Sequence, residues 1–174
     1  MKNNVVLTGF MGTGKSSVGR LLARRLGFTY RDLDAAVVSS AGKSINEIFA
    51  QEGEASFRGA EKAEIRKLSA CSRIVLSTGG GAVIDPENRA LLKSMGVVVN
   101  LTASVDEILL RLKGDSQRPL LREDRSEARL AAMLAEREPW YAEADIRIDT
   151  GGKKLEDVAQ QILDYLRRIR GWKL

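Results

Sequence analysis

A glycine-rich segment near the N-terminus constrains this chain more than any other feature. Residues 9–16 read GFMGTGKS and match the P-loop pattern GxxxxGK[ST], in which successive backbone N–H groups surround a phosphate. A strand-like apolar run (residues 4–8) precedes the motif and a helical pattern (residues 16–26) follows it, as a P-loop requires. The positive end of that helix points at the same anion. The motif predicts a nucleoside triphosphate site formed by Gly12, Thr13, Gly14, Lys15, Ser16 and Ser17.

Two of these residues have chemistry of their own. The ammonium of Lys15 is long enough to reach the phosphates that are transferred, so Lys15 is a candidate catalytic residue. The hydroxyl of Ser16 is a candidate ligand for Mg²⁺. The sequence therefore predicts ATP as a co-substrate and Mg²⁺ as its cofactor.

Apolar runs and helical patterns alternate along the rest of the chain. Strands are expected at residues 4–8, 28–33, 73–77, 97–101 and 146–149, and helices at 16–26, 35–41, 45–51, 56–70, 86–95, 104–113, 126–142 and 155–170. Ser104 and Glu107 have the spacing of a capping box. This alternation predicts an α/β fold: a five-stranded parallel sheet sandwiched by helices, within one domain over residues 1–174. Ligands of such sheets bind beyond the carboxyl ends of the strands.

Composition excludes several classes of protein. No run of 18 apolar residues is present, so no membrane span or membrane partner is expected. Cys71 is the only cysteine; it cannot form an internal disulfide, is expected to be a small buried hydrophobe, and is typical of a reducing cytoplasm. The chain has no histidine, so a proton acceptor at neutral pH must be a carboxylate or a rarer base.

Two aspartates follow the second predicted strand. In extended chain Asp32 and Asp34 would point to the same side, where one could lie near the metal and the other could accept a proton from a hydroxyl. The alternative is that Asp34 merely caps the next helix, a common use of aspartate.

Five further motifs resemble the shikimate kinase family in order and spacing, over residues 4–165. They are DLD at 32–34, GEASFR at 53–58, GGG at 79–81, RPLL at 118–121 and REPWY at 137–141. The resemblance implies a P-loop fold of the nucleoside-monophosphate-kinase type, with substrate-binding helices at about 32–61 and a mobile lid at about 112–125. It also implies ATP-dependent phosphorylation of the 3-hydroxyl of shikimate, a step toward aromatic amino acids.

The resemblance assigns roles residue by residue. Asp34 matches the residue that holds the substrate hydroxyls and is the candidate base, and Asp32 matches the residue near the metal. The other matched substrate-binding residues are Arg58, Gly79, Gly80, Gly81 and Arg137. On the nucleotide side the matches are the lid arginine Arg118, also a candidate catalytic residue, together with Arg111 and Lys153.

Some of these assignments have support or alternatives within the sequence itself. Arg137 falls on the same helical stripe as apolar residues, so it needs an anionic partner or a path by which its long side chain reaches solvent. Glu61 lies three residues after Arg58 and is expected to orient it, the alternative being an ordinary exposed ion pair. The segment 151–155, GGKKL, lacks the proline and arginine often found there in the family, which weakens the assignment of Lys153.

Two other functions remain open at this point. A related kinase on the same fold could act on a gluconate-like acid or a nucleoside monophosphate. A nucleotide-binding regulator without catalysis could bind nucleic acid, which the net charge of +5 permits, but the sequence has no nucleic-acid motif and few aromatic residues. The expected partners are therefore ATP and shikimate, with no nucleic acid, and the expected state is a monomer.

Overall fold

The sheet is parallel and is built as the sequence predicts. The structure, a computed structural model, describes residues 4–113, 126–169 and 172 of the 174-residue chain. Within these residues the sheet has five strands in the order β2-β3-β1-β4-β5, each paired in parallel with its neighbours. The strands are β1 (Asn4–Thr8), β2 (Thr29–Asp32), β3 (Ile74–Ser77), β4 (Gly96–Thr102) and β5 (Ile146–Asp149).

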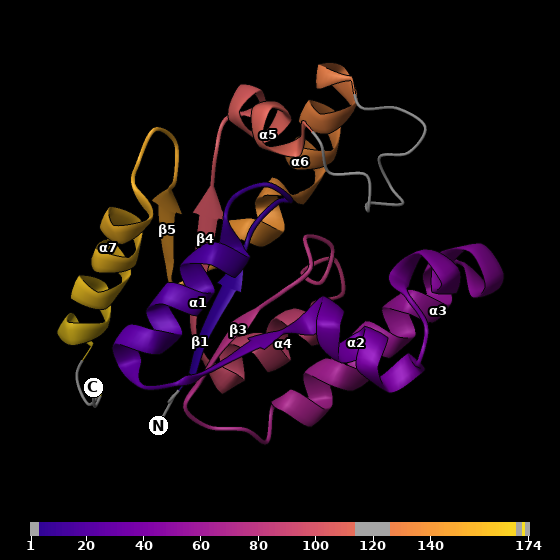
Figure 1. Cartoon of the computed structure of the whole chain (residues 1–174), viewed down its shortest axis with the longest axis horizontal. Coiled ribbons are helices and arrows are strands. Elements are labelled where there is room, and N and C mark those ends of the chain that lie inside the picture. The colour runs from indigo at the N-terminus through magenta and orange to yellow at the C-terminus, as the bar shows by residue number, and fades with distance from the viewer. Residues whose placement is uncertain (1–3, 114–125, 170–171, 173–174) are drawn as a thin grey trace.

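Helices cover both faces of the sheet because side chains alternate between the faces along each central strand. Val5 and Leu7 belong to a core that includes α1 (Lys15–Leu26) and α7 (Leu155–Arg168). Val6, between them, belongs to a second core with the end of α3 (Ile45–Leu68) and α4 (Pro86–Met95). Figure 1 shows the two layers, with α1 and α7 at one side of the sheet and α4 behind it.

The remaining helices lie at the carboxyl ends of the strands. Helices α5 (Val105–Leu112) and α6 (Glu127–Tyr141) form a third core with Phe10 and Met11 of the loop after β1. Helix α2 (Leu33–Ala41) packs with α3 in a fourth core, which contains Val37, Ile48 and Phe57. In Figure 1 these two groups stand on either side of the loops that follow β1 and β3. The loops therefore lie between two sets of helices.

The structure corrects several local expectations. The two helices expected at residues 45–51 and 56–70 form one element, α3, which is interrupted only by a non-helical backbone at Gly53. Gly96 ends α4 as its C-cap, as expected, but β4 already begins at Gly96 and not at residue 97. Cys71 is partly exposed and not fully buried. Among the described residues no helix is long and apolar enough to cross a membrane.

The expected capping box of α5 is formed only in part. The Ser104 side chain accepts from Glu107 N, but Glu107 Oε1 accepts from Gly152 N at 2.8 Å in the loop after β5. A complete capping box occurs instead at the start of α3, between Ser44 and Glu47. The carboxylate of Glu107 thus connects α5 with a distant loop.

Candidate active site

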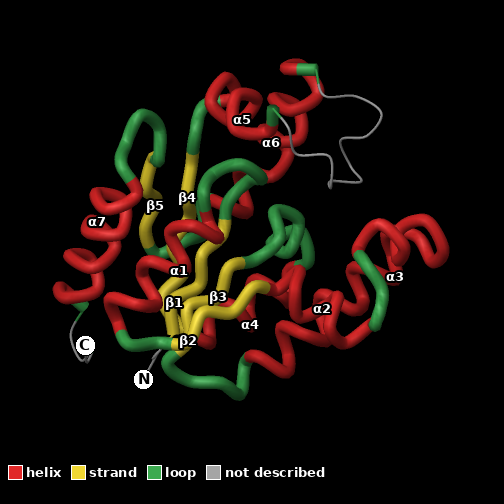
Figure 2. The backbone as a smooth tube through the Cα atoms, viewed as in Figure 1, coloured by secondary structure: helices red, strands yellow, loops and turns green. Residues whose placement is uncertain are grey.

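All five strands deliver their loops to one edge of the sheet, as a parallel sheet must. The P-loop follows β1, the aspartate segment follows β2 and the three glycines follow β3, while the loops after β4 and β5 close the same edge (Figure 2). Four of the segments predicted to carry function therefore meet in one place.

The P-loop has the backbone that its motif requires. Gly9, Gly12 and Gly14 all have positive φ, and α1 begins directly after Gly14. Lys15 is buried, and its Nζ donates to Gly9 O at 2.8 Å and to Phe10 O at 2.7 Å. The ammonium therefore lies within the loop, at the N-terminus of α1, where an anion would be attracted by both.

The two aspartates do not share a strand, and the expectation that they point to one side of extended chain is wrong. Helix α2 starts at Leu33, so Asp32 is its N-cap and Asp34 lies in its first turn. Asp32, and not Asp34, is the capping residue: its Oδ1 accepts from Ala35 N at 3.2 Å. The carboxylates separate because the chain turns from β into α conformation between them.

The second oxygen of Asp32 faces the P-loop. Oδ2 accepts from the hydroxyl of Tyr30 at 2.9 Å and lies 3.4 Å from Ser16 Oγ. Burial raises the pKa of Tyr30, so its phenol remains a donor to Asp32 over the physiological range. A hydroxyl and a carboxylate are hard oxygen ligands that suit Mg²⁺, which needs few protein ligands when phosphates supply others. The described residues contain no group of three or more acidic, histidine or cysteine side chains that would hold a metal by themselves.

Arg58 and Glu61 form the predicted ion pair, and it is mostly buried. Arg58 Nη1 donates to Glu61 Oε2 at 2.9 Å, and Nη2 donates to Glu54 Oε1 at 3.0 Å. Glu61 is 0% exposed, and its Oε1 has no hydrogen-bond partner. Burial raises the pKa of Glu61, and the nearby charge of Asp34 acts in the same direction, whereas Arg58 opposes both. The pair is therefore not an ordinary exposed ion pair, because the buried carboxylate of Glu61 fixes the position of the Arg58 guanidinium.

The glycines after β3 allow these side chains to approach the backbone. A Cβ on Gly79 would lie 2.9 Å from Asp34 Oδ1 and 3.0 Å from Glu61 Oε1. A Cβ on Gly81 would lie 2.7 Å from Arg58 Cζ. A Cβ at either position would force these side-chain groups to shift, so the glycines permit their close approach to the backbone. Asp34, Glu61 and Arg58 thus stand around the Gly79–Gly81 backbone.

Arg137, on α6, lies close to the same turn. It is 6% exposed, its guanidinium lies 5.6 Å from the centre of the Phe10 ring, and its Nε has no hydrogen-bond partner. A Cβ on Gly80 would lie 3.7 Å from Arg137 Nη1. Tyr141, one turn along α6, donates to Gly80 O at 2.6 Å. A buried guanidinium with an unsatisfied donor, close to open backbone, is arranged to bind an anion.

Tyr141 and Tyr30 were not predicted from the sequence. Burial raises the pKa of Tyr141 to about 12, which keeps it a hydrogen-bond donor to the turn. An aromatic residue on a helical stripe is normally read as core, and the hydroxyl contacts depend on tertiary position. Tyr141 closes the REPWY motif at 137–141, which was a signal for it, whereas nothing in the sequence separates Tyr30 from ordinary core residues.

Arg111 contacts the P-loop, and Lys153 lies in the loop after β5. Arg111 Nη1 donates to Gly12 O and to Thr150 Oγ1, both at 3.0 Å, and so connects the P-loop with the loop after β5. Lys153 Nζ donates to Asp149 O at 2.8 Å and is exposed, as is Ser17. Arg118 and the expected lid at about 112–125 fall, apart from residues 112 and 113, outside the described residues.

Comparison with known proteins identifies the family. A family model described as shikimate kinase matches residues 11–167. A shikimate kinase of Geobacter metallireducens is 63% identical over 163 residues, which cover 94% of this chain and 91% of that protein. The chain belongs to the shikimate kinase family. A solved structure of shikimate kinase from Acinetobacter baumannii in complex with shikimate has a TM-score of 0.91 at 39% identity, covering 95% of this chain and 93% of that one.

Membership in the shikimate kinase family settles the class of protein. The chain is an enzyme, a kinase with a P-loop fold of the nucleoside-monophosphate-kinase type. A gluconokinase from Sinorhizobium meliloti has a TM-score of 0.63 at 20% identity and covers 96% of this chain and 93% of that one. That likeness shows a shared fold alone. Membership in a family of enzymes excludes the non-catalytic regulator that the sequence had left open.

Proposed function

We propose that this chain transfers the γ-phosphoryl group of ATP to the 3-hydroxyl of shikimate, which yields shikimate 3-phosphate and ADP. The observation that carries the proposal is the placement of two arginines, Arg58 and Arg137, at the Gly79–Gly81 turn with Asp34 beside it. Shikimate is a carboxylate with three hydroxyls, and such a site offers guanidinium groups for the first and a carboxylate for the second.

The arginines differ in how they would bind the carboxylate. Arg58 is held by Glu54 and Glu61, and these partners raise its pKa although burial opposes the charge. Arg137 has an unpartnered Nε and is covered by Phe10. A substrate carboxylate would give Arg137 the anion that a buried guanidinium needs. Rigid and correctly aimed donors lose little freedom on binding, so both residues favour one orientation of the acceptor.

Asp34 is the proposed base and hydroxyl anchor. Its carboxylate lies against Gly79, next to the proposed acceptor site and on the first turn of α2. With no histidine in the chain, a carboxylate is the candidate that accepts the proton of the attacking hydroxyl. Phosphoryl transfer passes through a loose transition state, so positioning of the hydroxyl contributes as well as proton removal.

The nucleotide would occupy the P-loop side. Backbone N–H groups of residues 12–17 would bind the phosphates, and Lys15 would exchange its carbonyl partners for phosphate oxygens and balance charge on the transferred group. Arg111 and Lys153 would flank the nucleoside. Ser16 and Asp32 would hold Mg²⁺, which when bound neutralises negative charge on the phosphates.

Several further points are part of the proposal. Arg118, in a lid over residues 112–125, would add positive charge at the phosphates and exclude water. Residues 1–174 would form a single domain that acts as a monomer. The lone cysteine is consistent with the cytoplasm as its compartment.

A coupled assay of ADP release tests the function directly. We expect ADP release to depend on shikimate and Mg²⁺, and to remain near background with gluconate or AMP as acceptor. Mass spectrometry of the product would locate the phosphate at the 3-hydroxyl. Release that is equally fast with gluconate, or independent of any acceptor, would refute the proposal.

A further inference from the structure

The loop that carries the three glycines is held from outside the site. Residues 79–85 run from the end of β3 to Asp85, the N-cap of α4. Inside the loop, Ala82 N donates to Gly79 O at 3.2 Å and Ile84 N donates to Gly81 O at 3.1 Å. These two turns give the loop its shape, but they do not fix its distance from α6.

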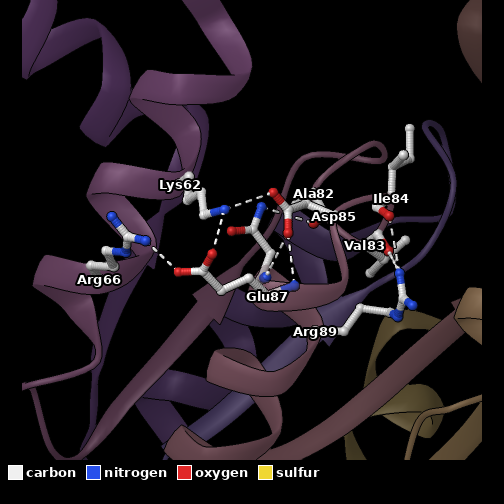
Figure 3. A network of polar contacts seen from close by, with 9 residues as sticks. Lys62, Arg66, Ala82, Val83, Ile84, Asp85, Glu87 and Arg89 are labelled. Atoms are coloured by element: carbon white, nitrogen blue, oxygen red, sulfur yellow. Dashed lines mark hydrogen bonds and ion pairs between the residues drawn. The ribbon is translucent and has the colours of Figure 1, made fainter. Parts of the chain in front are cut away.

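Arg89, in the first turns of α4, makes that connection. Its Nη1 donates to Val83 O at 2.8 Å and to Ile84 O at 3.0 Å, as Figure 3 shows. Its Nε lies 3.0 Å from Glu143 Oε1, just beyond the end of α6. The Arg89 side chain is only 17% exposed, and its guanidinium lies 5.8 Å from the centre of the Trp140 ring. One guanidinium thus joins the glycine loop to the end of α6.

The same helix carries both groups that meet the glycine turn from this side. Arg137 lies near Gly80, and Tyr141 donates to Gly80 O. We propose that Arg89 is a positioning residue that sets the Gly79–Gly81 backbone against Arg137, and so builds the carboxylate end of the acceptor site. This inference rests on the proposed function, because it takes shikimate as the acceptor.

The geometry favours an arginine over a lysine. A guanidinium presents donors in a fixed planar fork, so it serves two carbonyls and a carboxylate at once, whereas an ammonium is a single point of charge. Lys93 offers a matched comparison. Its Nζ lies 2.6 Å from Glu143 Oε2 but makes no hydrogen bond to a carbonyl of the loop at residues 79–85, and its side chain is 43% exposed. Lys93 therefore shares the ion pair of Arg89 without the link to the loop.

The opposite side of the loop is tied less firmly. Lys62 of α3 pairs with Asp85 at 3.0 Å and with Glu87 at 2.6 Å, and Arg66 also contacts Glu87 (Figure 3). These groups are more exposed, and exposed ion pairs contribute little. They also join the loop end to α3 and not to α6. Arg89 therefore joins the outer part of the loop to the end of α6, in addition to the direct bond from Tyr141 to Gly80 O.

Steady-state kinetics of Arg89→Met, Arg89→Lys and Lys93→Met test the inference. We expect Arg89→Met to raise the KM for shikimate by about 10-fold or more, with the KM for ATP within about twofold and kcat changed less than the KM for shikimate. Arg89→Lys should recover part of the loss, and Lys93→Met should stay within about twofold of the unsubstituted enzyme. An unchanged KM for shikimate, or an equal rise for ATP, would overturn the positioning role.

Hydrogen exchange supplies a measurement that does not depend on activity. The peptide covering residues 79–85 should exchange faster in Arg89→Met than in Lys93→Met or the unsubstituted chain. Unchanged exchange would also overturn the inference. If Arg89→Met does not fold, Arg89→Lys decides both measurements: the KM for shikimate and the exchange of residues 79–85 should rise above those of the unsubstituted chain, and values equal to it would overturn the inference. If the unsubstituted chain fails to phosphorylate shikimate, the proposed function fails, and exchange still decides whether Arg89 holds the loop.

Discussion

At the scale of single residues, the site divides its carboxylates among three tasks. Asp32 caps α2 and faces Ser16, Asp34 lies against the glycine turn, and Glu61 is buried beneath Arg58. Similar side chains thus serve different purposes because their surroundings differ. Substitutions of Asp34 and of Glu61 test two of these tasks separately.

Asp34→Asn separates chemistry from shape. The amide is nearly isosteric and still binds a hydroxyl, but it cannot accept a proton at neutral pH. We expect turnover to fall by about 10²–10⁴-fold, with ATP affinity nearly unchanged. Single-turnover rates across pH would measure the loss. Turnover within about threefold of the unsubstituted enzyme would reduce Asp34 to a hydroxyl anchor.

Glu61 should leave a signature in the pH dependence of stability. Its pKa in the folded chain is raised above the ordinary value of 4.5, so between these values the folded state holds more protons than the unfolded state. The contribution of Glu61 to the free energy of unfolding is therefore full below the ordinary pKa and is lost as pH rises through the raised one. Glu61→Gln cannot titrate. Urea unfolding from about pH 4 to 8 should show the advantage of the unsubstituted chain over Glu61→Gln shrinking as pH rises; a growing advantage would contradict the raised pKa.

At the scale of elements, α3 carries Arg58 and Glu61 past a break in the helix. Gly53 has φ 82° and ψ 172°, a conformation that only glycine adopts readily, and no atom lies within 4 Å of the position of a Cβ. Residues on both sides of the break, Ile48 before it and Phe57 after it, pack with α2, while Ile65 and Leu68 at the end of the helix reach the core under the sheet. The conformation at Gly53 therefore sets where Arg58 stands.

Gly53→Ala and Gly59→Ala should act in opposite directions within this one helix. Alanine at 53 meets backbone strain and should lower the free energy of unfolding by about 1–3 kcal/mol. Gly59 is helical and has the same open surroundings, so alanine there should raise it by about 0.5–1 kcal/mol. Urea denaturation of both variants provides the comparison. A stabilised Gly53→Ala would show that the break is not strained for other residues.

Sequence reasoning succeeded for elements whose information is local. The P-loop, the five strands and the i, i+3 pair of Arg58 with Glu61 all follow from patterns within a few residues. It failed where the outcome depends on distant partners. Glu107 has the spacing of a capping box, yet its carboxylate bonds Gly152 across the edge of the sheet. Arg89 looks like an ordinary helical arginine until α6 is placed beside it.

At the scale of the whole molecule, the parallel sheet brings the two halves of the site together. The loop after β1 would bind nucleotide, the segments after β2 and β3 would bind the acceptor, and α6 returns from 127–141 to complete the acceptor side. Each ligand that binds only the folded state should stabilise the entire chain, by about 2.7 kcal/mol at 100 times its Kd. The stabilisation by ATP therefore reports on the nucleotide half of the site, and the stabilisation by shikimate reports on the acceptor half.

Arg137→Ala should remove the stabilisation by shikimate and keep the stabilisation by ATP. The buried guanidinium lies near Gly80 and over the ring of Phe10, whereas Lys15 is held by the backbone carbonyls of the P-loop, so we expect loss of the guanidinium to weaken acceptor binding far more than ATP binding. In thermal unfolding we expect the rise in Tm with saturating shikimate to disappear in Arg137→Ala, while the rise with ATP and Mg²⁺ persists. Arg129→Ala, at an exposed position of the same helix, controls for general effects on α6 and should retain both rises. Comparing shifts within each variant cancels any loss of intrinsic stability. Equal loss of both shifts in Arg137→Ala would assign the arginine to the fold as a whole and remove it from the acceptor site.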